Sequence, residues 1–370
     1  MTYLRVILAR VLGSRRAAVG LGMLGVLTML GVFAEWFAAP APLVATGPLE
    51  VLPAIVHHER FDDLPESTAA AAYEGRAALW PIVHAGPTTI TTAGPNADPS
   101  RAHPLGTDTQ GRDLLARLVY GARTALGLSA GVLLLSIALG TALGGLAGLR
   151  GGFWNDGLVR LVETVDTFPA IIVVALVRAM ETTPSALSLV LAVAIVRWAE
   201  VARLVRAEVL RASTEGYAMA ARAMGASPMR IFYTHILRNA AGPILQSSVF
   251  GVASVVLLEA AISFLAIGAP THDASWGETL AEGATMWLRP PGAHAGPDPT
   301  ASTALRLLLA PGVFLLVTIV GSYLLAEAVR NAMEPKTARG TPPREKSKRR
   351  DGPVSLRGSG RDEGHGAASR

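Results

Sequence analysis

Long apolar runs separated by short polar connections make up most of the chain. A helix rises 1.5 Å per residue, so about 20 apolar residues cross the hydrocarbon core of a bilayer. Six runs approach or reach that length, at about 17–39, 124–149, 158–180, 185–199, 240–267 and 307–325. The strands of a transmembrane barrel alternate apolar and polar residues, which these runs do not. The pattern predicts an all-α membrane protein with about six transmembrane helices.

The second run is free of charge and contains a regular stripe of glycine. Gly140, Gly144 and Gly148 recur at four-residue spacing. This spacing places bare backbone on one helix face, where a neighbouring helix can pack closely.

Acidic residues lie inside two of the predicted spans. Glu163 and Asp166 fall in the third span and Glu259 in the fifth. Charges at that depth are usually turned toward protein or water, so these three are candidates for lining a translocation path. The alternative that we favour is pairing inside the bundle, with Arg160, Arg178 or the backbone.

Arginine and lysine are distributed asymmetrically among the connections. They gather before the first span, between spans four and five, and in the tail. By the positive-inside rule, both termini are expected in the cytoplasm. The chain then divides into a cytoplasmic N-terminus with the first span (1–39), an extended periplasmic segment (40–117), a five-helix core (118–335) with a cytoplasmic loop (200–239), and a disordered basic cytoplasmic tail (336–370). For the first run a cleaved signal is the alternative, because it follows two arginines and ends in small residues.

Composition narrows the classes of function. Hydrophobic residues form 51% of the chain and charged residues 16%, as expected for a protein in lipid. The net charge of +5 comes mainly from arginines beside the spans and in the tail, which indicates membrane lipid rather than nucleic acid as the partner. The chain has no cysteine, which excludes disulfides and thiol chemistry. No metal site is predicted, because regular ligand spacing is missing from the histidines His57, His58, His84 and His103.

The loop between spans four and five predicts a helical hairpin. Ser213 or Thr214 is expected to cap a short helix that continues to about Met224, with Glu215 in its first turn. Gly225 suits a left-handed stop, and Ser227 followed by Pro228 suits the start of a second helix. Small side chains at Ala220 and Ala221 would leave a low surface for another protein. The alternative is an amphipathic hairpin that lies on the membrane face.

This stretch resembles the coupling motif of ABC importer permeases. The matching positions are Ala220, Ala221, Gly225, His235, Ile236 and Leu237. Two positions depart from the motif: Met219 replaces an acidic residue and Arg238 replaces a proline. The first replacement removes a charge that could contact an ATPase.

Further segments resemble the dipeptide, oligopeptide and nickel group of these permeases, in the same order and over about residues 100–335. They are His103 to Asp113, Tyr120 to Thr124, Asp166 to Pro169, Ala202 to Leu210, Glu259 to Leu265 and Ser275 to Gly277. The end of the chain departs from the group at Tyr323 and Glu327, and the segment before His103 is longer than usual.

The resemblance implies a type I ABC importer transmembrane-domain fold and a permease that imports peptides or similar small solutes across a cell inner membrane. It implies a second permease subunit, two ATP-binding subunits that hold ATP and magnesium, and a periplasmic or lipid-anchored solute-binding protein. The resemblance also implies that this chain holds no nucleotide cofactor and is not itself an enzyme, and the absence of a Gly-x-x-x-x-Gly-Lys loop from the sequence agrees with the first point. The residues expected to couple to the ATPase are Glu215, Tyr217, Ala220, Ala221, Gly225, Ser227, Pro228 and His235.

Two functions from other classes remain as alternatives. A self-sufficient channel or ion-coupled carrier would be expected to have internal repeats and broken helices with charges at mid-depth. A membrane-embedded hydrolase would need a nucleophile and a base at matching depth, and no predicted span contains a histidine.

Overall fold

The computed structural model describes residues 2–46, 50–51, 65–181, 185–267, 274–288 and 301–333. Almost all of these residues outside 38–113 are helical, which confirms the all-α prediction for the membrane part. The predicted basic tail, His57 and His58 lie outside the described residues.

The chain begins with three helices, α1 (Thr2–Leu12), α2 (Arg15–Val32) and α3 (Ala34–Phe37). Helix α2 packs along α14 (Ala301–Met333), where a Cβ on Gly20 would lie 2.7 Å from the carbonyl oxygen of Gly321. The first predicted span is therefore a helix that ends and re-starts at Phe33.

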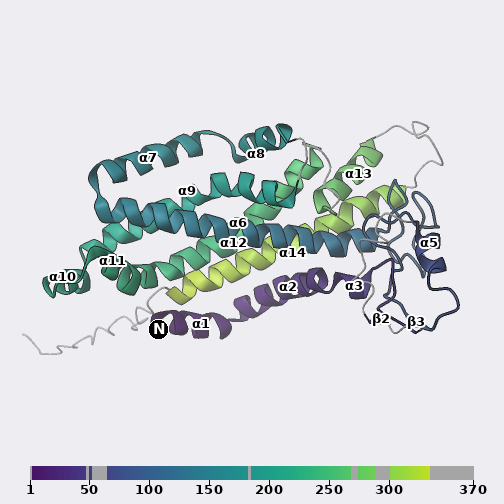
Figure 1. Cartoon of the computed structure of the whole chain (residues 1–370), viewed down its shortest axis with the longest axis horizontal. Helices are drawn as coiled ribbons and strands as arrows, with labels where there is room; N and C mark the ends of the chain where they lie inside the picture. Colours follow the sequence, from purple (N-terminus) through teal and green to yellow (C-terminus); the bar gives the residue numbers. More distant parts are fainter. Residues whose placement is uncertain are drawn as a thin grey trace, which may run out of the picture. The chain divides into compact units, whose positions relative to one another are not determined.

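Helix α6 (Leu114–Arg150) is the longest helix of the bundle, with 37 residues. It begins inside the predicted outer segment because the Asp113 carboxylate accepts a hydrogen bond from the amide of Ala116 and caps it. At 1.5 Å per residue the helix is about 55 Å long, so its two ends lie at opposite ends of the bundle (Figure 1).

The glycine stripe of α6 packs against α9 (Ala186–Ser213), as predicted. A Cβ on Gly140 would lie 2.6 Å from Cβ of Val201, and one on Gly148 would lie 2.7 Å from Cβ of Val209. A Cβ on Gly144 would overlap the carbonyl oxygen of Ala202. The close contact of these two helices depends on the missing side chains.

The third predicted span is wrong as a single helix. It is divided into α7 (Gly152–Thr167) and α8 (Ala170–Ala179), with the break at Phe168 and Pro169. Proline has no amide hydrogen and disfavours helical dihedral angles at the residue before it, and Phe168 accordingly has ψ 131°. Both pieces lie on one flank of the bundle (Figure 1).

The remaining helices follow the predicted order. Helix α9 continues to Ser213, past the predicted end of span four at about residue 199, and starts at a capping box formed by Ser185 and Ser188. It is followed by α10 (Gly216–Ala223), α11 (Pro228–Ile231), the π-helix η2 (Phe232–Ile236), α12 (Leu237–Phe264), α13 (Trp276–Leu288) and α14. Helices α6, α9, α12 and α14 run side by side (Figure 1).

Four of the described helical stretches are long and apolar enough to cross a membrane: Arg15–Val32, Leu114–Arg150, Pro228–Phe264 and Ala301–Met333. Helix α8 is apolar but shorter, and α9 gains many charges toward its C-terminus. The membrane fold is thus supported, and the number of six crossings stays a prediction.

The segment between α3 and α6 has a small fold of its own. Strands β2 (Glu50–Val51), β1 (Val44–Ala45) and β3 (Ala78–Leu79) pair antiparallel in that order, and α5 (Glu66–Ala71) follows β2. Tyr73 and Trp80 pack edge to face beside a cluster of small apolar residues. Part of this segment also packs on the start of α6, where Ala38, Val83 and Ala85 form a buried cluster with Ala116.

Candidate functional site

The predicted hairpin joins α9 to α12 and turns at Gly225. Gly225 has φ +83°, its amide donates to the carbonyl of Arg222 (2.9 Å), and the Ala226 amide donates to the carbonyl of Ala221 (3.0 Å). These two bonds form a Schellman motif, which closes a helix with a left-handed residue. The prediction of a left-handed stop at Gly225 is confirmed.

The second helix of the hairpin also begins as predicted. The Ser227 hydroxyl accepts from the amide of Arg230 (3.3 Å), and Pro228 occupies the first helical position. One π turn then connects α11 to α12 without a break, so residues 228–264 form one helical rod. Sequence reasoning missed the π turn, since no local signal marks it.

The predicted cap of the first helix is wrong. The hydroxyls of Ser213 and Thr214 donate backward, to the carbonyls of Leu210 (2.7 Å) and Arg211 (2.9 Å). They therefore finish α9 instead of starting α10. Glu215 occupies the cap position of α10 without a capping hydrogen bond, and its carboxylate lies 3.6 Å from Arg211.

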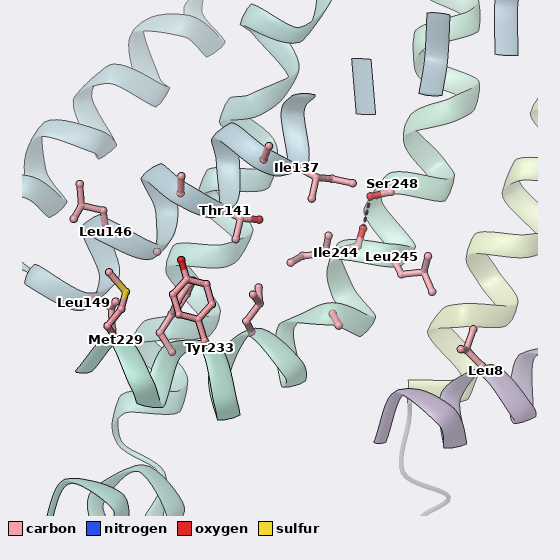
Figure 2. A pocket seen from close by; sticks show the side chains of 16 residues that line it. Leu8, Ile137, Thr141, Leu146, Leu149, Met229, Tyr233, Ile244, Leu245 and Ser248 are labelled. Carbon is pink, nitrogen blue, oxygen red and sulfur yellow. Dashed lines mark hydrogen bonds between the residues drawn. The ribbon is translucent and has the colours of Figure 1, made fainter. Parts of the chain in front are cut away.

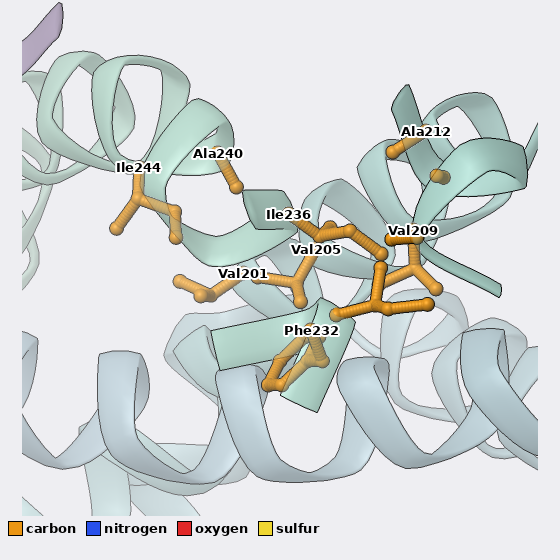
Figure 3. Packing of buried hydrophobic residues seen from close by; sticks show 11 residues of the cluster. Val201, Val205, Val209, Ala212, Phe232, Ile236, Ala240 and Ile244 are labelled. Atoms are coloured by element: carbon orange, nitrogen blue, oxygen red, sulfur yellow. The ribbon is translucent and has the colours of Figure 1, made fainter. Parts of the chain in front are cut away.

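One face of the hairpin is fixed to α9. Ala218 and Ala221 from α10 join Phe232 and Ile236 in a buried cluster with Val205 of α9 (Figure 3). Ala221 is only 6% exposed, so it packs inside this chain and offers no low surface to a partner. Ala220 remains exposed, as the prediction requires.

Tyr217 and His235 meet across the hairpin. Their ring centroids are 5.9 Å apart, and the amide of the Asn239 side chain donates to the Tyr217 hydroxyl (3.2 Å). This contact ties α10 to the start of α12. The outer face is apolar and basic, with exposed side chains at Met219, Arg222, Met224, Met229, Arg230, Tyr233 and Arg238.

The three candidate path residues do not lie together. Asp166 forms an ion pair with Arg203, and Glu163 lines a cavity of about 190 Å³ with Arg203 and Arg206. Glu259 is buried and accepts hydrogen bonds from the hydroxyls of Ser263 (2.9 Å) and Ser275 (2.8 Å).

Asp166 thus pairs with Arg203 instead of Arg160 or Arg178, and both side chains of this pair are exposed, so it is not a pair inside the bundle. Arg178 pairs instead with Glu181 (2.8 Å).

Two large apolar grooves run along α6. One has a volume of about 860 Å³ and lies between α6, the start of α12 and α1 (Figure 2). The other, of about 660 Å³, lies between α2 and the first half of α6. Both are lined by Ile137, so they continue one another, and neither is lined by Glu163, Asp166 or Glu259.

A buried charge cluster at the other end of α6 was missed by sequence reasoning. Arg117 is 1% exposed, and its Nη1 lies 2.5 Å from the carboxylate of Asp108 and 2.7 Å from that of Glu282. Arg112 binds the same two carboxylates, and Glu278 lies 3.1 Å from Arg117. Burial raises the pKa of the Glu282 carboxyl, an effect that Arg117 opposes.

This cluster fastens α13 to α6 and to the loop before it. The only signal of this cluster in the sequence is the charged segment from His103 to Asp113. Trp276 reinforces the junction, because its indole donates to the carbonyl of Leu118 (2.9 Å).

His103 lies next to this junction, almost fully buried. Its Nδ1 is 3.0 Å from Asp113 and its Nε2 is 3.9 Å from Glu66. The hydrogen bond to Asp113 raises the pKa of His103. No group of three potential metal ligands occurs among the described residues.

The family model and the similar proteins found by comparison point to the same family. The model for the binding-protein-dependent transport system inner membrane component matches residues 140–339. The chain is 30% identical over 244 residues to the oligopeptide transport system permease protein OppC of Bacillus subtilis, covering 65% of this chain and 75% of the relative.

Two further relatives have names of the same kind. The dipeptide transport system permease protein DppC of Alkalihalophilus pseudofirmus is 32% identical over 239 residues, covering 64% of this chain and 73% of the relative. The probable D,D-dipeptide transport system permease protein DdpC of Escherichia coli is 31% identical over 259 residues, covering 70% and 81%. The chain therefore belongs to the family of binding-protein-dependent transport system inner membrane components, the multi-pass permeases of ABC importers.

Proposed function

We propose that this permease passes peptides or similar small solutes from an external binding protein into the cytoplasm. Its partners would be a second permease subunit, a periplasmic or lipid-anchored binding protein and two ATP-binding subunits, which hold the ATP and magnesium. Both termini would be cytoplasmic, and the basic tail would lie near membrane lipid. Peptides are favoured over nickel because the relatives are named for peptides.

The observation on which the proposal rests is the construction of the Gly225 hairpin, residues 216–236. Its tip is exposed, while its inner face packs on α9 and its second arm continues as a rod of 37 residues through the bundle. At 1.5 Å per residue the rod is about 55 Å long. A movement imposed at the tip therefore reaches the far end of α12.

The far end of α12 is attached to α13. Ser275 bonds Glu259 and also accepts from the amide of Gly277 at the start of α13 (3.1 Å). Helix α13 in turn holds Glu282, which pairs with Arg117 of α6. ATP-driven movement of the hairpin would reach α13 and α6 through these contacts, as alternating access requires.

The exposed tip is suited to a protein partner. Methionine side chains adapt to different surfaces, and both methionine and arginine are enriched at interfaces. Met219 and Met224 are 55% and 82% exposed on the first arm, with Arg222 between them. We infer that this tip binds the ATPase through apolar contacts, with Met219 in place of the usual acidic residue.

Cross-linking tests the docking surface. The chain has no cysteine, so Ala220→Cys and Ala221→Cys each introduce a single thiol. In membranes containing the complete importer, Ala220→Cys should cross-link to the ATP-binding subunit, whereas the buried Ala221→Cys should react far less. Equal reaction at both positions, or none at Ala220→Cys, would contradict the proposed docking face.

Reconstitution tests the transported solute and separates the importer from a channel. Liposomes with both permeases, both ATP-binding subunits and the binding protein should accumulate labelled oligopeptide only with ATP. Liposomes with this chain alone should show no flux. Flux from the single chain would favour the self-sufficient channel or ion-coupled carrier instead.

A further inference from the structure

Helix α1 has two faces of different character. Ile7 and Val11 are one helical turn apart and are buried against the ends of α12 and α14. The Arg10 guanidinium donates to the carbonyl of Ala332 near the end of α14 (3.1 Å). The other side leaves Leu8 and Leu12 exposed, Leu12 by 68%.

The segment around α1 is entirely basic. The first 34 residues contain Arg5, Arg10, Arg15 and Arg16 and no acidic residue. All four arginines are exposed. Only Arg16 lies near a carboxylate of the described residues, at 3.8 Å from Glu327.

The charge on α1 lies directly before a helix of membrane length. The helix ends at Leu12, and α2, which is apolar enough to span, begins at Arg15. Leu8 also lines the 860 Å³ groove, at its edge (Figure 2). The exposed apolar side of α1 is thus continuous with this groove.

We propose that α1 is a binding surface for anionic phospholipid. The guanidinium groups of Arg5, Arg15 and Arg16 would pair with headgroup phosphates, and Leu8 and Leu12 would enter the acyl region beside the groove. An amphipathic helix with basic and apolar residues lies in the membrane interface in this way. Anionic lipid is specified because the segment has an uncompensated positive charge.

The full-length chain in nanodiscs provides the test. A single Leu12→Cys is labelled with an environment-sensitive fluorophore, and phosphatidylglycerol is titrated into phosphatidylcholine discs. We expect a blue shift that grows with phosphatidylglycerol and disappears in about 1 M salt, where the screening length falls to about 3 Å. Removing one arginine should weaken the titration about fivefold, and Arg5→Gln/Arg15→Gln/Arg16→Gln together about 100-fold.

Two controls separate binding from disturbance. A label at Leu79→Cys, which is 61% exposed on β3, should show no dependence on phosphatidylglycerol and should report an intact fold in the triple variant. Neutralising Arg222 and Arg230 on the hairpin together with Arg238 at the start of α12 removes the same charge elsewhere and should leave the Leu12→Cys titration unchanged.

The proposal would be overturned by a wild-type signal that ignores phosphatidylglycerol. It would equally fail if the triple variant titrated like the wild type. A shift that follows protein density instead of lipid composition would mean that a second copy of the chain covers α1.

Discussion

Gly225 allows the turn of the hairpin to be tested at one backbone position. Its φ of +83° lies in the left-handed region, and a Cβ added there would meet nothing within 4 Å. Substitution by alanine therefore adds backbone strain without a steric clash. That strain is about 1–2 kcal/mol for a residue with a side chain.

The strain shifts the equilibrium between the closed and the open turn. The Ala226 amide is held by the carbonyl of Ala221 within the Schellman motif, so it exchanges with solvent only when the turn opens. A loss of 1–2 kcal/mol raises the open population by a factor of about 5–30. Gly225→Ala should accelerate exchange of peptides covering 221–231 by that factor.

Two variants make the result specific. Gly225→Asn should accelerate exchange less, because asparagine tolerates the left-handed region. Gly216→Ala lies in the same hairpin, also in open space and without positive φ, and should leave exchange unchanged or slower. If Gly225→Ala exchanged like the wild type, or if Gly216→Ala matched it, the left-handed turn would be refuted. Gly225→Val should also capture less ATP-binding subunit than Gly216→Val in co-purification.

Three further predictions concern the contact of α6 with α9, the buried charge cluster around Arg117, and His103. Gly144→Val should lower the free energy of unfolding in detergent by about 1–3 kcal/mol, because its Cβ would overlap α9. Gly127→Val places the same side chain in open space and should be nearly neutral. Similar losses in the two variants would contradict the close contact of α6 with α9. Arg117→Met should destabilise by about 3–5 kcal/mol by leaving Asp108 and Glu282 buried without their partner, and Glu282→Gln in addition should recover part of the unfolding temperature. The raised pKa of His103 means that its protonated form stabilises the fold. Protection of residues 65–113 from proteolysis should therefore be full below about pH 6.5 and fall as pH rises through the raised pKa. His103→Gln should remove this pH dependence, and a dependence that survives would exclude His103 as its source.

The sequence by itself determined the elements whose signals are local. Apolar runs of membrane length predicted the helices, and glycines four residues apart predicted that a neighbouring helix packs closely on α6, without identifying that helix as α9. Gly225, Ser227 and Pro228 predicted the turn, because a left-handed dihedral angle, a hydroxyl cap and a fixed φ each act within a few residues. The break at Pro169 also has a local cause, the missing amide hydrogen, although apolar residues continue beyond it.

The tertiary structure alone decided which side chains meet. Arg117 and Glu282 are 165 residues apart in sequence, and Asp166 and Arg203 are 37 apart, so no periodicity could pair them. Adjacent alanines at 220 and 221 look equivalent in sequence, yet a helix turns about 100° per residue and directs one outward and the other into the cluster on α9. Local dihedral preferences fix where a helix starts and stops, whereas burial and charge pairing depend on which helices pack together.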